Sequence, residues 1–348
     1  MIYLDSDYMV GAHPEVMSRL AATNMERTVG YGFDPYTASA RRKILDACGI
    51  TDGEVVFACG GTQTNAIMID RLIRRGEGVL AADTSHINVH EAGAVESNGH
   101  KVLALPSNDG KINANQIRTY IEEYYKDETW QHIVRPAMVY LTYPTELGTL
   151  YSKEELTDIS NACHQAKIPL YIDGARLAYG LAANGGETTL KDLARLADVF
   201  YIGGTKCGLL FGEAIVSRHK SLLEGMLPHV KRHGALLAKG RLLGVQFDTL
   251  FTDNLYGRIG EHAINLARKL REGLISNGFR LFVNSPTNQQ FFILPNEKID
   301  ELSKVASFEF WGPRGETESA LRLVVDWSTS EEEVDTLISL LGKGIDSQ

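Results

Sequence analysis

Short, almost continuously apolar runs alternate with longer amphipathic stretches over the first two thirds of the chain. Strands covered by helices on both faces are nearly all apolar, because neither face meets water. Runs of this kind predict strands at residues 54–59, 78–83, 101–106, 137–142, 168–173, 198–203 and 213–217. The amphipathic stretches predict helices, including residues 62–75 and 152–167, the second of which opens with the capping-box pair Ser152 and Glu155. This alternation predicts an α/β domain with a mainly parallel, seven-stranded sheet flanked by helices.

The pattern changes after about residue 217. Helical periodicity dominates residues 222–277, strand candidates follow at 290–294 and 320–326, and a closing helix is expected from Ser330. This order predicts a smaller α+β domain at the C-terminus. No Pro- or Ser-rich linker separates the two parts. We therefore place a soft boundary between residues 1–245, which hold the N-terminal segment and the large domain, and residues 246–348.

Composition and charge narrow the class of protein. The 348 residues include 35 basic and 44 acidic side chains, which gives a net charge of −9 and excludes a typical nucleic-acid binder. Cys48, Cys59, Cys163 and Cys207 form no CxxC pair, which argues against a zinc site or a disulfide scaffold. No apolar run is long enough to cross a membrane, and the first residues lack a secretory signal. We expect a cytoplasmic globular protein with no metal centre.

Polar residues interrupt the apolar pattern where predicted strands end, which is where α/β proteins bind ligands. Gly60, Gly61 and Thr62 follow a strand and open a helix, an arrangement that suits a phosphate group. An ordinary glycine-rich turn is the alternative. Asp173 closes another strand and needs a cationic or N–H partner to stay ionised. Arg176 or a protonated heteroaromatic nitrogen would serve, and a purely structural Asp–Arg bridge is the alternative.

Two further side chains stand at strand ends. Lys206 lies among small residues without charged neighbours, so desolvation is expected to lower its pKa and make it a competent amine nucleophile. A solvated turn lysine is the alternative. His86 follows the 78–83 strand and could stack on a planar cofactor, although a structural histidine is the more common case.

Together these positions supply an anion cradle, a ring-stacking group, a carboxylate and an amine. Pyridoxal 5′-phosphate requires this set, because it presents a phosphate, an aromatic ring, a pyridinium nitrogen and an aldehyde. The chain contains neither GxGxxG nor GxxxxGK[ST] after a strand, so a dinucleotide or a nucleoside triphosphate is not indicated.

The chain resembles the low-specificity threonine aldolases of the β-eliminating lyase group, which are pyridoxal phosphate enzymes with an aspartate-aminotransferase-like fold. The matching pieces span nearly the whole chain: residues 4–7 (LDSD), 31–35 (YGFDP), 60–62 (GGT) with Asn65, 83–86 (DTSH), 172–176 (IDGAR), Lys206 and 321–324 (LRLV). The resemblance implies retro-aldol cleavage of a threonine-like β-hydroxy-α-amino acid to glycine and an aldehyde. It also implies a homodimer or homotetramer with active sites at subunit interfaces.

The resemblance also implies a role for each site residue. Lys206 would form the Schiff base with the cofactor, Asp173 would pair with the pyridine nitrogen, and His86 would stack over the ring. The remaining cofactor contacts would come from Gly60, Gly61, Thr62, Arg176, Thr205 and, across a subunit interface, Arg232. The substrate carboxylate would be bound by Ser6, Arg176 and Arg322, the last being suited by its two parallel N–H donors. The alternative for Arg322 is a structural ion pair on an edge strand, and the alternative for Arg232 is a charge on an exposed helix face.

One stretch departs from the family pattern. Threonine aldolases usually carry a histidine for the substrate β-hydroxyl in the segment that corresponds to residues 142–148, which here reads TYPTELG. Tyr143 or Glu146 could take over this proton transfer, and Glu146 could equally be a solvated loop residue. The lysine is also preceded by Gly-Gly-Thr, where the family more often has serine. Other functions therefore stay open: a pyridoxal phosphate-dependent β-elimination or transamination, an NAD-dependent reaction, or a non-catalytic binding module.

Overall fold

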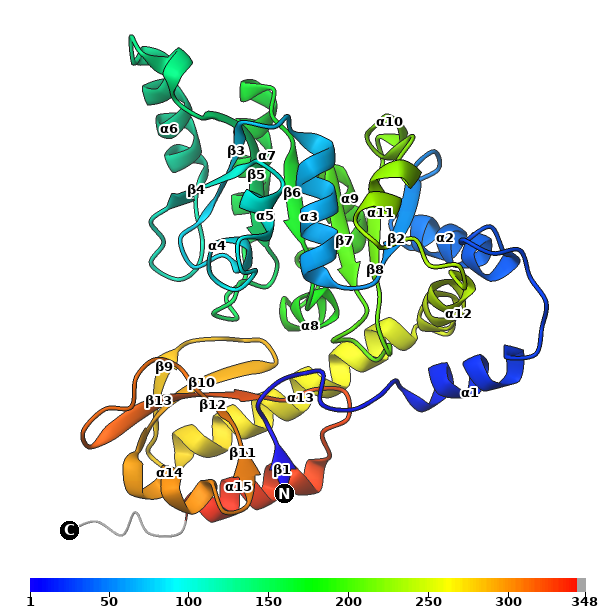
Figure 1. Ribbon diagram of the computed structural model, residues 1–348. Helices are drawn as coiled ribbons and strands as arrows, with labels where there is room; N and C mark the ends of the chain where they lie inside the picture. Colours follow the sequence, from blue (N-terminus) through cyan, green and yellow to red (C-terminus); the bar gives the residue numbers. More distant parts are fainter. Residues whose placement is uncertain (343–348) are drawn as a thin grey trace.

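The computed structural model describes residues 1–342 and is built around one seven-stranded sheet (Figure 1). Its strand order is β2 (Glu54–Ala58), β8 (Glu213–Ser217), β7 (Val199–Gly203), β6 (Leu170–Asp173), β5 (Arg135–Thr142), β3 (Glu77–Ala82) and β4 (Lys101–Leu105). Strand β8 runs antiparallel to both of its neighbours, and the other neighbouring strands of this sheet pair in parallel. The predicted mainly parallel sheet is thus confirmed. Because six strands run in one direction, their carboxyl ends meet at one edge of the sheet.

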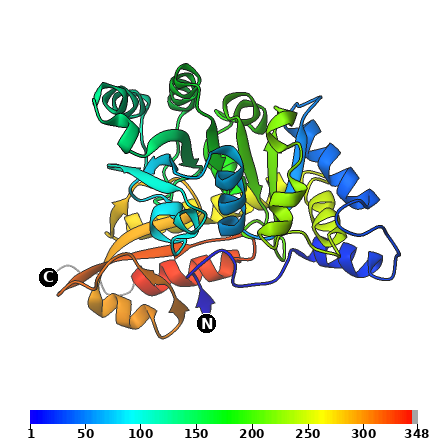
Figure 2. The same ribbon diagram turned by 45° about the horizontal axis from the view of Figure 1, so that its top comes forward.

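Helices cover both faces of this sheet, which explains why its strands are nearly all apolar (Figure 2). One face packs against α3 (Gly61–Leu72), α4 (His86–Val89), α5 (Ala94–Ser97), α10 (Lys220–Leu223) and α11 (Leu227–Arg232). The core of the other face is shared with α1 (Pro14–Thr23), α2 (Pro35–Ala47), α6 (Ala114–Lys126), α7 (Lys153–Ala166), α8 (Leu177–Ala183), α9 (Leu190–Leu196) and α12 (Arg241–Leu250). A short 3-10 helix, η1 (Trp130–His132), follows α6.

The C-terminal part forms the smaller α+β unit that the sequence predicts. Its antiparallel sheet has the order β12 (Glu309–Phe310), β13 (Glu318–Val324), β10 (Gln289–Pro295) and β9 (Arg280–Val283). Helices α14 (Asn296–Leu302) and α15 (Glu331–Gly342) contribute to its core. The predicted closing helix therefore begins at Glu331, directly after Ser330, whose side chain accepts a hydrogen bond from the Glu333 N–H.

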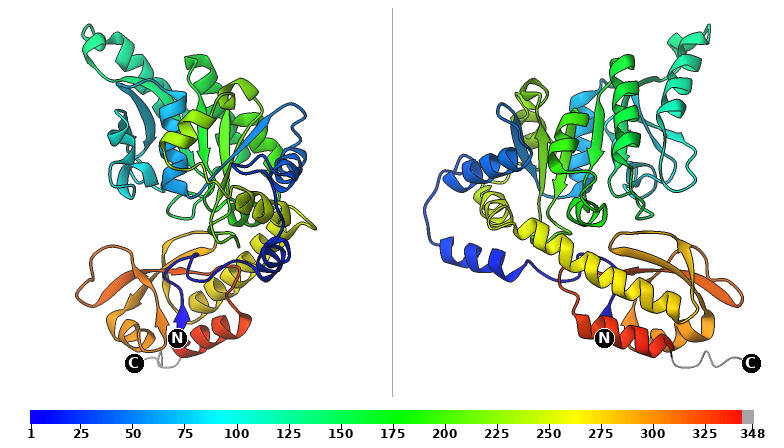
Figure 3. Two further views of the ribbon diagram at one scale, coloured as in Figure 1. Left: turned by 45° about the vertical axis from the view of Figure 1, so that its right-hand side comes forward. Right: turned by 180° about the vertical axis from the view of Figure 1, so that it is seen from behind.

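Two segments tie the smaller unit to the large one. The long helix α13 (Leu255–Ser276) begins in the core of the large domain, with Ile259 and Ala263, and continues into the small core, with Leu270 and Leu274 (Figure 3). At the other end of the chain, β1 (Ile2–Tyr3) pairs in parallel with β11 (Ala306–Ser307). Leu4 belongs to the small core. The first residues therefore pack with the C-terminal unit, and the division at residue 245 stays a prediction.

Two general features of residues 1–342 bear on the class of protein. No helix in this range is long and apolar enough to span a membrane. Within the same range, no cluster of three or more His, Cys, Asp or Glu side chains is placed to hold a metal ion. The four cysteines are unpaired, and three of them are buried.

Candidate active site

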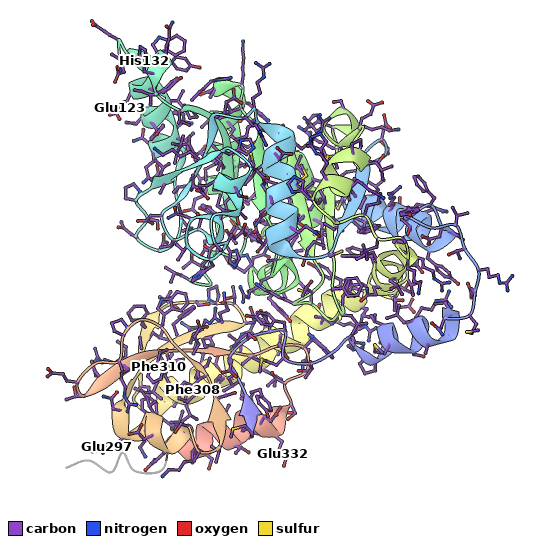
Figure 4. All side chains as sticks on the ribbon, in the orientation of Figure 1. Glu123, His132, Glu297, Phe308, Phe310 and Glu332 are labelled. Carbon is purple, nitrogen blue, oxygen red and sulfur yellow. The ribbon has the colours of Figure 1, made fainter. Side chains whose placement is uncertain are left out.

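A cavity of about 330 Å³ opens at the edge where the parallel strands end. It is lined by residues from α3 and from the segments that follow β3, β5, β6 and β7. A second cavity of about 600 Å³ shares Tyr8, His86, Glu146, Arg176 and Lys206 with the first and extends to the small domain. The small domain's share of the wall includes Phe308, which Figure 4 labels together with its neighbour Phe310. Nearly all the predicted site residues line one of these two cavities.

Asp173 closes β6 and is held rigidly at the bottom of the first cavity. Its side chain is buried, with one oxygen accepting hydrogen bonds from the Tyr140 hydroxyl (2.6 Å) and Asn65 Nδ2 (3.0 Å). The other oxygen accepts from the Ala175 N–H at 2.9 Å. The alternative of a structural Asp173–Arg176 bridge does not apply, because Arg176 binds Asp7. The buried carboxylate therefore has three neutral donors and no cationic partner among the described residues.

His86 stands above this carboxylate at the start of α4. Its Nδ1 lies 2.8 Å from Oε1 of Glu91, whose side chain is fully buried, so the carboxylate accepts a hydrogen bond from Nδ1–H. The same Glu91 oxygen accepts from Asn65 Nδ2 at 2.7 Å. Asn65 thus joins Glu91 to Asp173 through one amide group. This network fixes the His86 ring at the cavity wall, and its role as a ring-stacking group stays a prediction.

Lys206 follows β7 and reaches both cavities. Burial, with a smaller contribution from the Arg176 charge, lowers the pKa of its amine below the usual value. Its Nζ lies 5.9 Å from the centre of the Tyr8 ring and forms no ion pair within residues 1–342. The predicted desolvated amine is therefore present, and the solvated-turn alternative does not apply.

Thr205 also lines the first cavity, but its polar atoms are bound within the protein. Its hydroxyl donates to Oε1 of Glu213 at 2.7 Å and accepts from the Gly212 N–H at 3.0 Å. Its own N–H donates to the Gly212 carbonyl at 3.1 Å. Its predicted role in cofactor binding stays a prediction, since these bonds leave it no free donor.

The predicted phosphate cradle lies at the N-terminus of α3. Gly60 precedes the helix, Gly61 and Thr62 begin it, and the first N–H groups of a helix have no acceptor within it. A Cβ added to Gly60 would meet no atom within 4 Å, whereas one added to Gly61 would come 3.2 Å from the Tyr201 hydroxyl. That hydroxyl lines the cavity, is buried and has no partner in residues 1–342. Free N–H groups and an orphaned hydroxyl suit a phosphate oxygen.

Arg176 is bound by an acid from the N-terminal segment. Its Nε and Nη2 donate to the two oxygens of Asp7 at 2.6 and 3.0 Å. Asn288 Nδ2 also donates to Asp7, at 3.1 Å, and so adds the small domain to this contact. Burial raises the pKa of Asp7, but the charges of Arg176 and Lys206 and these hydrogen bonds outweigh burial and hold it below its usual value.

The other predicted carboxylate ligands lie in the second cavity. Ser6 is buried, and its Oγ has no hydrogen-bond partner in the described part of the chain. Arg322 on β13 forms an ion pair with Glu309 and donates to the Gln289 side chain at 3.1 Å. Its Nε is buried without a partner. Ser6 and Arg322 therefore both hold unused donors at one cavity wall.

Three predictions outside this group have different outcomes. Glu146 lines both cavities and accepts from the Thr142 hydroxyl and the His86 N–H, both at 2.7 Å, so it is not a solvated loop residue. Tyr143 is fully buried in the core and lines neither cavity, which rules it out as the proton-transfer group. Arg232 lies on α11, where it is exposed and pairs with Asp70 at 2.9 Å.

Four residues that shape the site escaped the sequence analysis: Asp7, Glu91, Tyr140 and Glu213. Asp7 lies within the LDSD segment, but its partner is 169 positions away in the chain. Glu91 gives no signal, because it lies in a polar stretch between short helices. Tyr140 and Glu213 interrupt apolar strands with polar groups, a sign that could have marked them as facing a site.

The fold and the site define a class. A lysine, a buried carboxylate and a histidine line one cavity beside a helix N-terminus, at the edge where the parallel strands end. This set of groups fits pyridoxal phosphate. The β-eliminating lyase family matches residues 4–293, and the chain belongs to that family. It is therefore a pyridoxal phosphate-dependent lyase.

Known proteins place the chain near threonine aldolases. It is 32% identical to the low-specificity L-threonine aldolase of Pseudomonas aeruginosa, over 95% of this chain and 94% of that protein. The corresponding yeast enzyme, from Saccharomyces cerevisiae, is 25% identical over 79% of this chain and 70% of its own length. Among solved structures, the threonine aldolase of Leishmania major superposes with a TM-score of 0.94 at 40% identity, covering 98% of both chains.

Proposed function

We propose that this enzyme cleaves a threonine-like β-hydroxy-α-amino acid between Cα and Cβ, releasing glycine and an aldehyde. One observation carries the proposal: Lys206 and Asp173 line a single cavity that continues into a second one holding Arg322 and Ser6. A ligand in these cavities meets an amine and a carboxylate at one end and carboxylate-binding donors at the other. The similarity to threonine aldolases over nearly the whole chain supports the same reaction.

The residues present fit pyridoxal phosphate. Lys206 would hold its aldehyde carbon, Asp173 its ring nitrogen and His86 the face of its ring. The first turn of α3, with Gly60, Gly61 and Thr62, would bind its phosphate. When bound, the cofactor supplies an electron sink for the pair left on Cα after the bond breaks.

Asp173 keeps this sink effective by holding a proton at the ring nitrogen. The buried carboxylate has neutral donors only, so a protonated nitrogen is the charge it lacks. The Asn65 amide and the Tyr140 hydroxyl lock the carboxylate in place, which limits the reorganisation needed during the reaction.

The substrate carboxylate would be bound by the unused donors of the second cavity. Ser6 and Arg322 line that cavity, and Ser6 Oγ and Arg322 Nε are buried atoms without a hydrogen-bond partner in residues 1–342. Arg176 lines the same cavity, but its Nε and Nη2 donate to Asp7. We therefore assign the main carboxylate contacts to Ser6 and Arg322, with Arg176 adding its positive charge.

Glu146 is the residue we assign to the β-hydroxyl proton. Burial raises the pKa of its carboxyl above the usual value, and the nearby Asp173 charge adds to this rise. The hydrogen bonds from Thr142 and His86 lower the pKa but do not cancel the effect of burial. A carboxylate with a raised pKa is a stronger base than a solvated one, as proton abstraction from a hydroxyl requires. It fills the role that the missing histidine of residues 142–148 leaves open.

Two measurements test the reaction. The purified enzyme, supplied with pyridoxal phosphate, should develop a visible absorbance band that changes on addition of glycine. Threonine or its isomers should then yield glycine and acetaldehyde in equal amounts. Pyruvate-type keto acid and ammonia in place of glycine would instead identify β-elimination, the second reaction that the family name includes.

Assembly and location belong to the same proposal. We propose a homodimer or homotetramer in which Arg232 reaches the phosphate of the neighbouring subunit. Arg232 is exposed and lies outside its own cavity, and α11 borders a surface hollow lined by the exposed Tyr31, Phe33 and Leu227. Cytoplasmic location is supported by the unpaired cysteines. Light scattering with wild type and Arg232→Ala, each with and without cofactor, tests the assembly.

A further inference from the structure

Glu213 is a buried acid at the cavity that the proposed mechanism does not use. It begins β8, beside the lysine-bearing turn, and its side chain is 3% exposed. It lines the first cavity together with Gly61, Thr62 and Tyr201, the residues of the phosphate cradle. No cationic side chain forms an ion pair with it in the described part of the chain. A carboxylate in this position would share the cavity with a bound phosphate and have no ion-pair partner of its own.

The hydrogen bonds of Glu213 show which neighbouring groups could accept a proton on its carboxyl group. Oε1 accepts from the Thr205 hydroxyl at 2.7 Å, and Oε2 accepts from the Gly204 N–H at 3.1 Å. Both partners are donors, so within residues 1–342 neither supplies an acceptor for a proton on Glu213. The Thr205 hydroxyl accepts from the Gly212 N–H and donates to Glu213, so in this arrangement it offers Glu213 a donor. The open side of the acid faces the cavity.

We propose that Glu213 is a proton-carrying acid of the phosphate subsite, which is a neutral carboxylic acid when cofactor is bound and donates a hydrogen bond to a phosphate oxygen. This inference rests on the proposed pyridoxal phosphate site. Where Glu213 is a carboxylate before binding, which is the case well above pH 8, loading takes up one proton from solvent and converts it to the carboxylic acid. No electron is transferred and no covalent bond to the ligand is needed.

The electrostatic surroundings favour the neutral form. Burial raises the pKa of Glu213 to about 8, against the hydrogen bonds from Thr205 and Gly204. The groups that face it from neighbouring elements are Tyr171, Asp173, Tyr201, Lys206, Cys207 and Tyr256. Of these, Lys206 favours the carboxylate and Asp173 opposes it. Burial keeps the tyrosines and the cysteine neutral by raising the pKa of each. A phosphate dianion would strengthen the preference for the acid.

The test counts protons taken up on binding. Pyridoxine 5′-phosphate is the probe, because it carries the ring and the phosphate but no aldehyde, so Lys206 cannot bond to it. Titration calorimetry in buffers with different ionisation enthalpies gives the proton uptake for the wild type and for Glu213→Gln. With a free-state pKa of about 8, about nine-tenths of Glu213 is ionised at pH 9 and about one-tenth at pH 7. The wild type should therefore take up nearly one proton more than the variant at pH 9.

The affinity for pyridoxine 5′-phosphate should depend on pH through the same proton. Above about pH 8, binding by the wild type should weaken by up to tenfold per pH unit relative to the variant. Glu96→Gln, on the exposed helix α5, is the control for loss of a negative charge and should match the wild type. Pyridoxine without phosphate should show no difference in proton uptake between wild type and Glu213→Gln. Such a difference would overturn the assignment to the phosphate.

The outcomes separate this inference from the proposed function. Equal proton uptake in wild type and Glu213→Gln at pH 9 overturns the role of Glu213 while leaving the cofactor site intact. Absence of any binding to the wild type overturns both. If circular dichroism shows that Glu213→Gln is unfolded, infrared difference spectra of wild type with carbon-13-labelled glutamate replace it. Binding of the probe at pH 9 should then create a labelled carboxylic-acid band, and its absence refutes the proposal.

Discussion

The Asp7–Arg176 pair makes the sharpest prediction about how the two domains are held together. Asp7 comes from the N-terminal segment, Arg176 from the large domain, and Asn288 from the small domain. The Asp7 side chain is fully buried and that of Arg176 is 12% exposed. Replacing Asp7 with alanine would leave a guanidinium buried without its counter-charge. We therefore expect Asp7→Ala to destabilise the fold strongly.

The magnitude follows from the burial of both partners. Removing one partner of a buried pair costs about 3–5 kcal/mol, because the remaining charge has lost its compensation. At about 2–4 °C per kcal/mol for large domains, the melting temperature should fall by at least about 6 °C. Asp52→Asn is the control, because Asp52 is exposed and lies 3.8 Å from the exposed Lys220. An exposed pair contributes about 0–1 kcal/mol, so its loss should barely move the melting temperature.

Scanning calorimetry of four proteins completes the test: wild type, Asp7→Ala, Arg176→Met and the double variant. The double variant should melt above Asp7→Ala, because no unpaired charge remains buried. Since the pKa of Asp7 is lowered in the folded state, its contribution is present above the unfolded pKa of about 3.9. The difference between wild type and Asp7→Ala should therefore shrink as the pH falls below about 4. Melting temperatures within 2 °C at pH 7, or strictly additive losses, would refute the argument.

Three further predictions concern the chemistry. Lys206→Ala should remove both the visible absorbance of the reconstituted enzyme and its turnover; a retained band would contradict the lysine assignment. Asp173→Asn should still bind cofactor but lose about 10²–10³ in kcat, measured as glycine release, and a rate near wild type would exclude the electron-sink role. Burial raises the pKa of Glu146, so kcat should rise with pH as this carboxyl loses its proton. Glu146→Gln should lower kcat about 10²-fold and remove this rise from the pH profile.

The sheet could be predicted because the apolar pattern of each strand is visible within the strand's own residues. Each strand is covered on both faces, so an apolar run such as residues 137–142 marks the strand without knowledge of its neighbours. Strand β9 was missed because its residues alternate between exposed and half-buried and it is only partly covered. The helical region 222–277 is broken into α10, α11, α12 and α13, and Gly225 and Gly234 adopt positive φ angles of 71° at two of the breaks. Glycine accepts this backbone conformation at little cost.

The site could be predicted only for residues whose place in the sequence also indicates that they lie close together in the fold. Lys206, Asp173 and His86 follow parallel strands, so their convergence at one edge follows from the strand direction alone. The ion-pair partner of a side chain does not follow from the strand direction. Arg176 lies three positions from Asp173 but bonds to Asp7, because the small domain brings the N-terminal segment across the sheet edge. Contacts of this kind depend on how the two domains pack, which no local pattern records.

The distribution of charge explains why one orientation of the ligand is favoured. Asp173, Glu91 and Glu213 are buried acids at or behind the first cavity, and none forms an ion pair with Lys or Arg in residues 1–342. Asp173 accepts hydrogen bonds from neutral donors only, and a protonated ring nitrogen would balance its charge. At the far wall, Arg322 and Ser6 have donors left over for an anion. With the ring nitrogen of the cofactor at Asp173, the substrate carboxylate would meet these donors, so the distribution of charge favours the proposed arrangement.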